Sequence, residues 1–220
     1  MFIITGASDG LGLELARLLL AQGKAVTSLS RRKPSVAEID WLETDLSQER
    51  SIESAAGRLL GRGESFEALV NCAGVMTIAP ETLMFDELDR VFRANILGHI
   101  MLTAKLMPRI KKDGADIVNV SSDVAVKGYF DQAYGASKWA MRGFSQNLQL
   151  ELKDTPCRVI SFCPGGFRSR ILEKVTGQKL RDPENWMAAE DVARCLLQTI
   201  ELPKNMQVSE IIVNRKVVTL

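Results

Sequence analysis

The chain has 220 residues, 46% of them hydrophobic, which is enough apolar material to form the core of a single domain. Its 28 lysines and arginines nearly balance its 27 aspartates and glutamates, so no large basic field would attract nucleic acid or an anionic membrane. The four cysteines form no C-x-x-C pair, and the single histidine, His99, completes no familiar zinc site with them. We therefore expect one domain over residues 1–220, no metal and a small-molecule partner.

Short runs rich in valine and isoleucine alternate along the chain with longer stretches of helical periodicity. The predicted strands are residues 1–5, 25–30, 39–43, 68–71, 116–121, 158–163 and 210–214. The predicted helices are residues 11–22, 48–60, 85–111, 133–152 and 189–200. This alternation predicts an α/β fold, a doubly wound parallel sheet of about seven strands flanked by helices. The first residues carry no basic leader and only a short apolar run, which predicts a cytoplasmic location without a membrane span.

A glycine-rich turn, residues 5–12 with the sequence TGASDGLG, directly follows the first predicted strand and precedes an apolar helix pattern. Glycines let the backbone approach a pyrophosphate closely, and the N–H groups and dipole at the start of a helix stabilise the anion. A tight turn can also use glycine without binding a ligand. Between a strand and a helix, the turn predicts a Rossmann-type dinucleotide site formed by Gly6, Ser8, Asp9, Gly10, Leu11 and Gly12.

The second predicted strand ends in Ser30, Arg31 and Arg32, where a site for NAD usually has an acidic residue that binds the ribose hydroxyls. A guanidinium binds the 2′-phosphate of NADP through paired, charge-assisted hydrogen bonds, whereas a carboxylate would repel it. Alternatively, the two arginines are a solvated pair that begins a loop, and Asp9 mildly favours NAD. We expect NADP(H) as the cofactor, with Arg31 bound to its phosphate and with Ser30 and Arg32 in support.

Tyr134 and Lys138 lie four residues apart near the start of a predicted helix, so they share one helix face. A tyrosine with an ordinary pKa of about 10 is a poor base at neutral pH, but a nearby ammonium favours its phenolate. We predict that Tyr134 exchanges a proton with a carbonyl or alcohol, and that Lys138 lowers the pKa of Tyr134 and holds the nicotinamide ribose. Because such pairs are also common on helix surfaces, this prediction depends on the other motifs.

Six short motifs follow one another along the chain: residues 5–12, residues 71–74 (NCAG), Asn95, the pair Ser121 and Ser122, residues 134–138 (YGASK), and the pair Pro164 and Gly165. In order and placement they resemble the short-chain dehydrogenase/reductase family over nearly the whole chain. Separated motifs that agree in order are more specific than any one of them. The resemblance implies an NADP(H)-dependent oxidoreductase that moves hydride between the nicotinamide and a carbonyl or alcohol substrate.

The resemblance also assigns further roles. It implies that Asn95 lies next to a water that links Lys138 to solvent, and that Ser122 donates a hydrogen bond to the substrate carbonyl. Ser121 remains an alternative donor, because the spacing from Ser122 to Tyr134 is one residue shorter than is usual in the family. Cofactor contacts are implied for Asp45, Leu46, Asn71, Ala73, Gly74, Pro164, Gly165, Phe167 and Ser169, as well as for Tyr134 and Lys138.

The segment from about residue 169 to residue 187 resembles a short form of the family's substrate lid, with candidate contacts at Ile171, Leu172, Val175, Leu180 and Trp186. The resemblance further implies a homodimer or homotetramer built on the helices that start near residues 85 and 133. Two alternatives stay open: an NAD-dependent alcohol dehydrogenase, and a non-catalytic NADP(H)-sensing protein that regulates a partner. His99 is expected to contribute to helix packing or to a subunit contact, and to take no direct part in catalysis.

Overall fold

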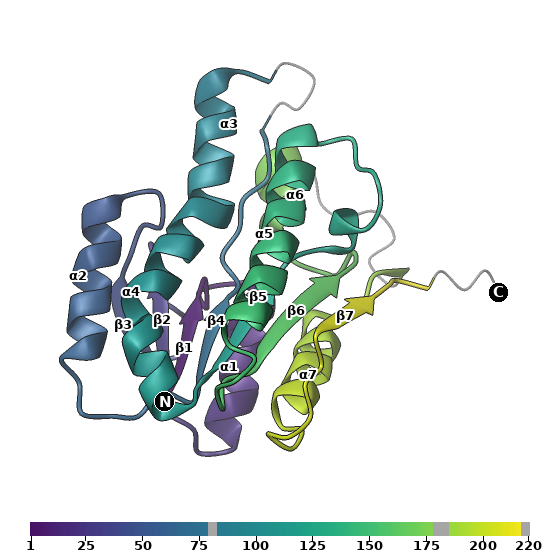
Figure 1. The fold of residues 1–220 in the computed structure, drawn as a ribbon. Coiled ribbons are helices and arrows are strands. Elements are labelled where there is room, and N and C mark those ends of the chain that lie inside the picture. Colours follow the sequence, from purple (N-terminus) through teal and green to yellow (C-terminus); the bar gives the residue numbers. More distant parts are fainter. Residues whose placement is uncertain (79–82, 178–184, 217–220) are drawn as a thin grey trace.

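The computed structural model describes residues 1–78, 83–177 and 185–216. Within these residues, seven parallel strands form one sheet in the order β3-β2-β1-β4-β5-β6-β7 (Figure 1). The strands are β1 (Phe2–Thr5), β2 (Val26–Ser30), β3 (Asp40–Glu43), β4 (Ala68–Asn71), β5 (Asp116–Val120), β6 (Val159–Pro164) and β7 (Glu210–Val213). The predicted fold class, a Rossmann-type parallel sheet, is therefore confirmed.

Helices connect the strands and bury their apolar faces on the sheet. They are α1 (Gly10–Ala21), α2 (Glu49–Leu60), α3 (Phe85–Phe92), α4 (Gly98–Asp113), α5 (Gln132–Glu151), α6 (Arg170–Thr176) and α7 (Ala189–Ile200), with a π-helical turn η2 (Arg93–Leu97) and a 3-10 turn η3 (Asp123–Ala125). Strands β1 to β7 and helices α1, α2, α5 and α7 begin and end within one residue of the predicted bounds. The alternation of apolar runs and helical periods therefore locates these elements.

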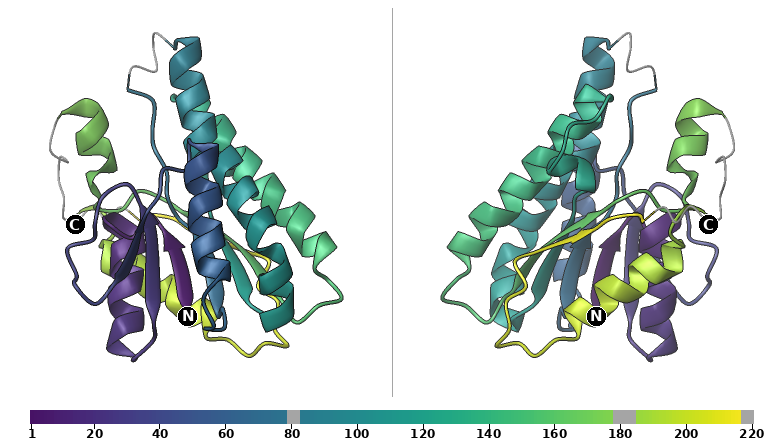
Figure 2. Two further views of the ribbon diagram at one scale, coloured as in Figure 1. Left: turned by 90° about the vertical axis from the view of Figure 1, so that its left-hand side faces the viewer. Right: turned by 90° about the vertical axis from the view of Figure 1, so that its right-hand side faces the viewer.

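Both faces of the sheet are covered. Helices α1 and α7 pack together on one face, while α2, α4 and α5 cover the other (Figure 2). Leu15 and Leu196 belong to the apolar cluster on the first side, and Leu59 and Leu106 to the cluster on the second. Strands β1, β2, β4, β5 and β6 are buried along their whole length, as is usual for parallel strands that are covered on both faces.

The helix predicted over residues 85–111 is continuous from Phe85 to Asp113 and contains a π-helical turn. The π-helical turn η2 lies between α3 and α4 and buries the side chains of Asn95 and Ile96. The apolar period continues through the turn, so the sequence pattern does not reveal it; such turns are frequent at functional sites. The sequence also does not predict α6, because its seven residues are too few for a helical period to stand out.

The strand order reverses between β1 and β4, since β2 and β3 extend the sheet on one side and β4 to β7 extend it on the other. At such a switch point the connections leave in opposite directions, which opens a crevice at the carboxyl ends of the strands. Helices α3 and α6 rise above this edge on opposite sides (Figure 2). None of the helices in the described part of the chain has the length and apolar composition that crossing a membrane requires.

Candidate active site

A cavity of about 960 Å³ lies at the carboxyl edge of the sheet. It extends from the glycine-rich turn after β1 and the end of β2, across the switch point, to α5 and the segment after β6. The predicted site residues that line it are Gly6, Ser8, Asp9, Gly10, Leu11, Gly12, Ser30, Arg31, Arg32, Asp45, Leu46, Ala73, Gly74, Ser122, Tyr134, Lys138, Pro164, Gly165, Phe167 and Ser169. The other two, Asn71 and Asn95, are fully buried behind its wall.

The turn after β1 is packed so closely that two positions require glycine. Gly6 has a φ of 77°, and a Cβ at this position would lie 2.9 Å from the Cα of Ala73. A Cβ on Gly12 would lie 2.8 Å from the carbonyl oxygen of Gly6. The Asp9 carboxylate caps α1 by accepting a hydrogen bond from the amide of Gly10 at 2.9 Å. The N-terminus of α1 therefore faces the cavity, in an arrangement that fits a pyrophosphate.

The end of β2 presents two exposed arginines to the cavity, and their surroundings differ. Nη2 of Arg32 lies 3.6 Å from the carboxylate of Asp9, whereas Arg31 forms no ion pair with any residue that the structure describes. The hydroxyl of Ser30 donates to the carbonyl of Arg32 at 2.8 Å, so it fixes the turn. The guanidinium of Arg31 is consequently the more available cation at this end of the cavity.

The turn after β3 forms a side wall. The Asp45 carboxylate accepts hydrogen bonds from the amide and the hydroxyl of Ser47, at 2.9 and 2.8 Å, which closes the turn before α2. Leu46 is buried, and its carbonyl packs directly against Gly98 at the start of α4. This wall is therefore held by α4 as well as by its own turn.

Asn71 stabilises the loop after β4 through hydrogen bonds on the side away from the cavity. Its Nδ2 donates to the hydroxyl of Thr103 at 3.1 Å and to Oδ1 of Asn119 at 2.8 Å, while its Oδ1 lies 3.2 Å from Nδ1 of His99. Nε2 of His99 lies 3.0 Å from the carbonyl oxygen of Ala73. Burial lowers the pKa of His99 to about 4, so the ring is neutral near pH 7. These residues support the cavity wall without facing the cavity.

Asn95 ties the same loop to the π-helical turn and to α5. Its Oδ1 accepts from the amide of Val75 at 2.7 Å, and its Nδ2 donates to the Val75 carbonyl at 2.8 Å and to the Ser137 hydroxyl at 3.0 Å. A Cβ on Gly74 would lie 3.6 Å from Oδ1 of Asn95 and 3.4 Å from Nζ of Lys138. Gly74 therefore separates the Asn95 amide from the Lys138 ammonium.

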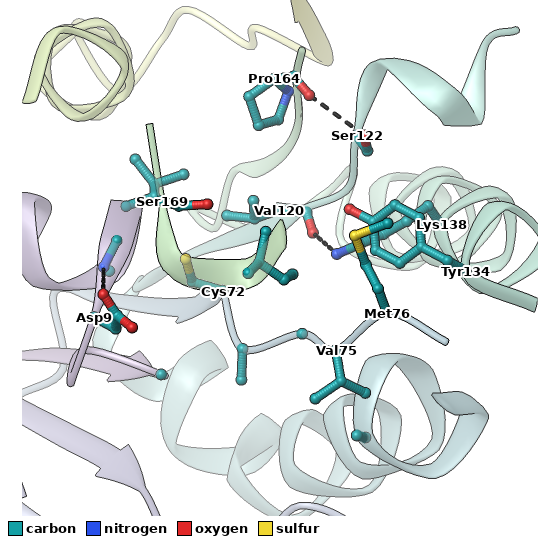
Figure 3. A pocket seen from close by; sticks show the side chains of 18 of the residues that line it. Asp9, Cys72, Val75, Met76, Val120, Ser122, Tyr134, Lys138, Pro164 and Ser169 are labelled. Carbon is teal, nitrogen blue, oxygen red and sulfur yellow. Dashed lines mark hydrogen bonds between the residues drawn. The ribbon is translucent and has the colours of Figure 1, made fainter. Parts of the chain in front are cut away.

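Tyr134 and Lys138 line the cavity from the first turns of α5 (Figure 3). Lys138 is buried, and its Nζ donates to the carbonyl of Val120 at 3.0 Å and lies 5.7 Å from the centroid of the Tyr134 ring. Ser122 lines the same cavity and interacts with the phenol of Tyr134. Ser122 is also 3.4 Å from the carbonyl oxygen of Pro164 (Figure 3). Two hydroxyls and one ammonium thus converge at this end of the cavity.

Burial dominates the acid–base properties of this group. It lowers the pKa of Lys138 to about 8. It also raises the pKa of Tyr134 above the ordinary value, as do the phenol of Tyr129 and the carboxylates of Asp123 and Asp131, while the hydrogen bond with Ser122 opposes them. The predicted lowering of the Tyr134 pKa by Lys138 is therefore not found, and Tyr134 is protonated at neutral pH in this arrangement.

The two serines after β5 have different partners. The Ser121 hydroxyl donates to the carbonyl of Lys138 at 2.7 Å, which joins the end of β5 to α5. The Ser122 hydroxyl instead makes longer contacts, at 3.3 Å to Oδ1 of Asp123 and at 3.4 Å to the Pro164 carbonyl. Both serines line the cavity, and of the two hydroxyls that of Ser121 has the shorter hydrogen bond within the protein.

Several lining residues were missed by the sequence reasoning. Asp123 and Lys127 pair at 2.6 Å beside Ser122, and their four-residue spacing on a short turn was an available signal. The guanidinium of Arg215 lies 4.6 Å from the ring centroid of Trp186. Arg215 follows β7, and no local motif marks it because only the fold brings it to the cavity. Other such residues are Cys72, Val75, Met76, Ile78, Arg90, Tyr129 and Asn214.

The expected lid contacts are described only in part. Ile171, Val175 and Trp186 line the cavity. The side chain of Leu172 and the whole of Leu180 lie outside the described residues. The apolar contacts expected here therefore share the cavity with the charged side chains of Asp123 and Lys127.

Comparison with known proteins agrees with this architecture. The 3-ketodihydrosphingosine reductase of Bacteroides thetaiotaomicron is 28% identical over 212 residues, which cover 92% of this chain and 75% of that protein. An alcohol dehydrogenase from the archaeon Thermococcus sibiricus, complexed with 5-hydroxy-NADP, has a TM-score of 0.85 and 24% identity, with 96% and 94% of the two chains covered. A 4-hydroxyisoleucine dehydrogenase complexed with NADH has a TM-score of 0.84 and 24% identity, with 97% and 96% covered.

A protein-family model described as short chain dehydrogenase matches residues 1–180, which is most of the chain. The match includes the glycine-rich turn, the loop after β4, the serine pair and the Tyr134–Lys138 motif. The chain belongs to the short-chain dehydrogenase/reductase family, a family of oxidoreductases built on the nucleotide-binding Rossmann fold.

Proposed function

We propose that this chain is an NADP(H)-dependent oxidoreductase that transfers hydride between the nicotinamide and a carbonyl or alcohol substrate. The observation that carries the proposal is the continuity of one cavity, which has the guanidinium of Arg31 at one end and the hydroxyl of Tyr134 and the ammonium of Lys138 at the other. Solved structures of similar fold are complexed with 5-hydroxy-NADP and with NADH, which supports a nicotinamide cofactor.

The residues present fit such a cofactor, because side chains at Gly6 and Gly12 would close the turn at the N-terminus of α1. In the proposal that turn binds the pyrophosphate, Arg31 binds the 2′-phosphate, and Lys138 holds the nicotinamide ribose. The Asp45–Leu46 wall would hold the adenine, and the segment from Pro164 to Ser169 would cover the nicotinamide. When bound, the cofactor supplies or accepts the hydride.

The acid–base step belongs to Tyr134. Its raised pKa keeps the hydroxyl protonated at neutral pH, so the proton needed by a carbonyl oxygen during reduction is already in place. Ser122, which lines the cavity with Tyr134, positions the same carbonyl oxygen and stabilises the charge that develops on it. The ammonium of Lys138, 5.7 Å from the Tyr134 ring, stabilises the phenolate that remains.

The test is a panel of ketones and aldehydes assayed with NADPH and with NADH through nicotinamide absorbance. Tyr134→Phe serves as the blank, because it removes the transferable proton and keeps the aromatic ring. We expect reduction by the wild-type protein, and in Tyr134→Phe a loss of turnover of about 100-fold or more with cofactor binding retained. Tight NADPH binding without turnover across the panel would instead favour a non-catalytic NADP(H)-sensing protein.

An NAD-dependent alcohol dehydrogenase is the second candidate. It is favoured by the Asp9 carboxylate, which lies 3.6 Å from Arg32 and places negative charge near the phosphate end of the cavity. The two candidates share the chemistry at Tyr134 and differ in the ratio of NADPH to NADH affinity. Fluorescence titration with both cofactors therefore separates them.

A further inference from the structure

A nearly buried carboxylate with no part in the proposed reaction lies next to the proposed substrate-binding hydroxyls. Asp123 follows Ser122 in η3, lines the cavity and is 8% exposed. On the opposite side, a Cβ on Gly165 would lie 3.0 Å from Oδ2 of Asp123, so the absence of a side chain there leaves room for the carboxylate. The charge of Asp123 contributes to the raised pKa of Tyr134, which agrees with its position near that hydroxyl.

The two carboxylate oxygens of Asp123 have different partners. Oδ2 pairs with Nζ of Lys127 at 2.6 Å, and the Lys127 side chain is 58% exposed. Oδ1 accepts a long hydrogen bond from the hydroxyl of Ser122, at 3.3 Å, and the single proton of that hydroxyl is shared with the Pro164 carbonyl, at 3.4 Å. Among the described residues, the negative charge is therefore balanced by Lys127, and Oδ1 depends on Ser122 for its hydrogen bond.

Substrate binding removes that hydrogen bond. A serine hydroxyl carries one proton, so Ser122 cannot donate to a substrate carbonyl and to Oδ1 of Asp123 at the same time. A buried carboxylate oxygen without a donor destabilises the complex. A substrate that brings its own donor to Oδ1 restores the hydrogen bond, whereas a plain ketone leaves the oxygen without one.

We infer that Asp123 makes this site selective for α-hydroxy carbonyl compounds, in which a hydroxyl on the carbon next to the reacting carbonyl donates to Oδ1. The inference rests on the proposed function and specifies its substrate class. The distance between Oδ1 and the Ser122 hydroxyl, 3.3 Å, suits two oxygens on adjacent carbons of one substrate. A neutral hydroxyl fits better than an ammonium, because Lys127 already balances the charge of Asp123. In the reverse direction, the corresponding substrates are 1,2-diols.

Binding is measured without turnover, using Tyr134→Phe saturated with NADP⁺ and calorimetric titration of a matched pair, 2-hydroxycyclohexanone and cyclohexanone. We expect the hydroxyketone to bind about tenfold or more tightly than the ketone. In the double variant with Asp123→Ala, the two should bind within about twofold of each other. Equal binding of the pair to Tyr134→Phe would overturn the inference, as would tighter binding of protonated 2-aminocyclohexanone.

Turnover is measured with NADPH on the same pair, comparing the wild-type protein with Asp123→Ala and Asp123→Asn. Asp123→Ala should lose about tenfold in kcat/KM for the hydroxyketone, while the value for cyclohexanone stays level or rises. Asp123→Asn keeps an acceptor oxygen and should retain part of the preference. Asp40→Ala is the matched control, because Asp40 is ion-paired with Arg62 outside the cavity, and it should leave the ratio unchanged. A parallel loss with both ketones in Asp123→Ala would assign Asp123 a structural role and overturn the inference.

The two arms separate the two proposals. If the wild-type protein reduces ketones but binds the pair equally, the substrate class is wrong and the oxidoreductase assignment stands. If it reduces neither ketone yet prefers the hydroxyketone in binding, the assignment of turnover fails and the recognition by Asp123 stands.

Discussion

The carboxylate of Asp131 binds both the backbone and the side chain of Thr77. It accepts from the Thr77 amide at 2.9 Å and from the Thr77 hydroxyl at 2.6 Å. Asp131 is 1% exposed and also caps α5 by accepting from the amide of Tyr134 at 3.0 Å. One buried side chain therefore joins the loop after β4 to the start of the helix that carries the proposed acid.

Asp131→Ala should lower the free energy of unfolding by about 3 kcal/mol, because it removes a helix cap and leaves a buried donor without a partner. The measurement is urea unfolding followed by circular dichroism. Asp154→Ala is the control, since Asp154 is exposed and its loss should change stability by less than about 0.5 kcal/mol. Equal effects of the two substitutions would contradict the role given to the Asp131 network.

Arg31→Ala should weaken NADPH binding by about 10- to 100-fold and leave NADH binding unchanged, because it deletes the proposed partner of the 2′-phosphate. Arg32→Ala should have a smaller effect, since Arg32 shares its charge with Asp9 at 3.6 Å. Both are measured by fluorescence titration with the two cofactors. An unchanged NADPH to NADH ratio in Arg31→Ala would support the NAD-dependent alternative.

Ser121→Ala and Ser122→Ala should differ in their effect on turnover. Ser121→Ala removes a buried hydrogen bond to the Lys138 carbonyl, so the unfolding free energy should fall by about 1 kcal/mol while most of the turnover remains. Ser122→Ala removes the proposed carbonyl donor, so turnover should fall about 100-fold; it also removes the hydrogen bond to Asp123, so the unfolding free energy should fall by about 1 kcal/mol, as in Ser121→Ala. Steady-state kinetics and urea unfolding on both variants check this; the reverse pattern would assign the carbonyl contact to Ser121.

His99 should contribute to the pH dependence of stability. Its pKa is lowered from 6.5 to about 4 by burial, so between these values the unfolded chain binds a proton that the folded protein does not. Stability should therefore be full above pH 6.5 and fall as the pH drops toward 4, by at most about 3 kcal/mol from this residue. His99→Gln should show a correspondingly shallower decline in urea unfolding at pH 7 and pH 4.5. Parallel pH profiles for the two proteins would refute this contribution.

Local sequence pattern is sufficient to predict most of the fold. Buried parallel strands such as β4 and β5 need apolar runs, and the helices between them need apolar stripes, so both leave a period in the sequence. The π-helical turn at Arg93–Leu97 leaves none, because it shifts the hydrogen-bond register of one turn without changing which residue types are apolar. The helix predicted through this region is therefore confirmed, and only its π-helical turn is not predicted.

The candidate site is predictable where a motif is local. The glycine-rich turn and the pair Tyr134 and Lys138 can be recognised in the sequence alone, and in the structure their residues line one cavity. Arg215 reaches the same cavity from the end of β7, and this proximity depends on the order of the strands. The acid–base state of Tyr134 also depends on the fold, since burial by several elements decides the direction of its pKa shift.

Lys138 is attached to β5 twice, once through its ammonium to the carbonyl of Val120 and once through its own carbonyl to the hydroxyl of Ser121. The second attachment does not involve the lysine side chain. Replacing Lys138 by methionine thus deletes the charge while the backbone tether between strand and helix persists. Because this backbone hydrogen bond keeps α5 in place, the effect of the ammonium charge on cofactor binding and turnover can be measured separately from the position of the helix.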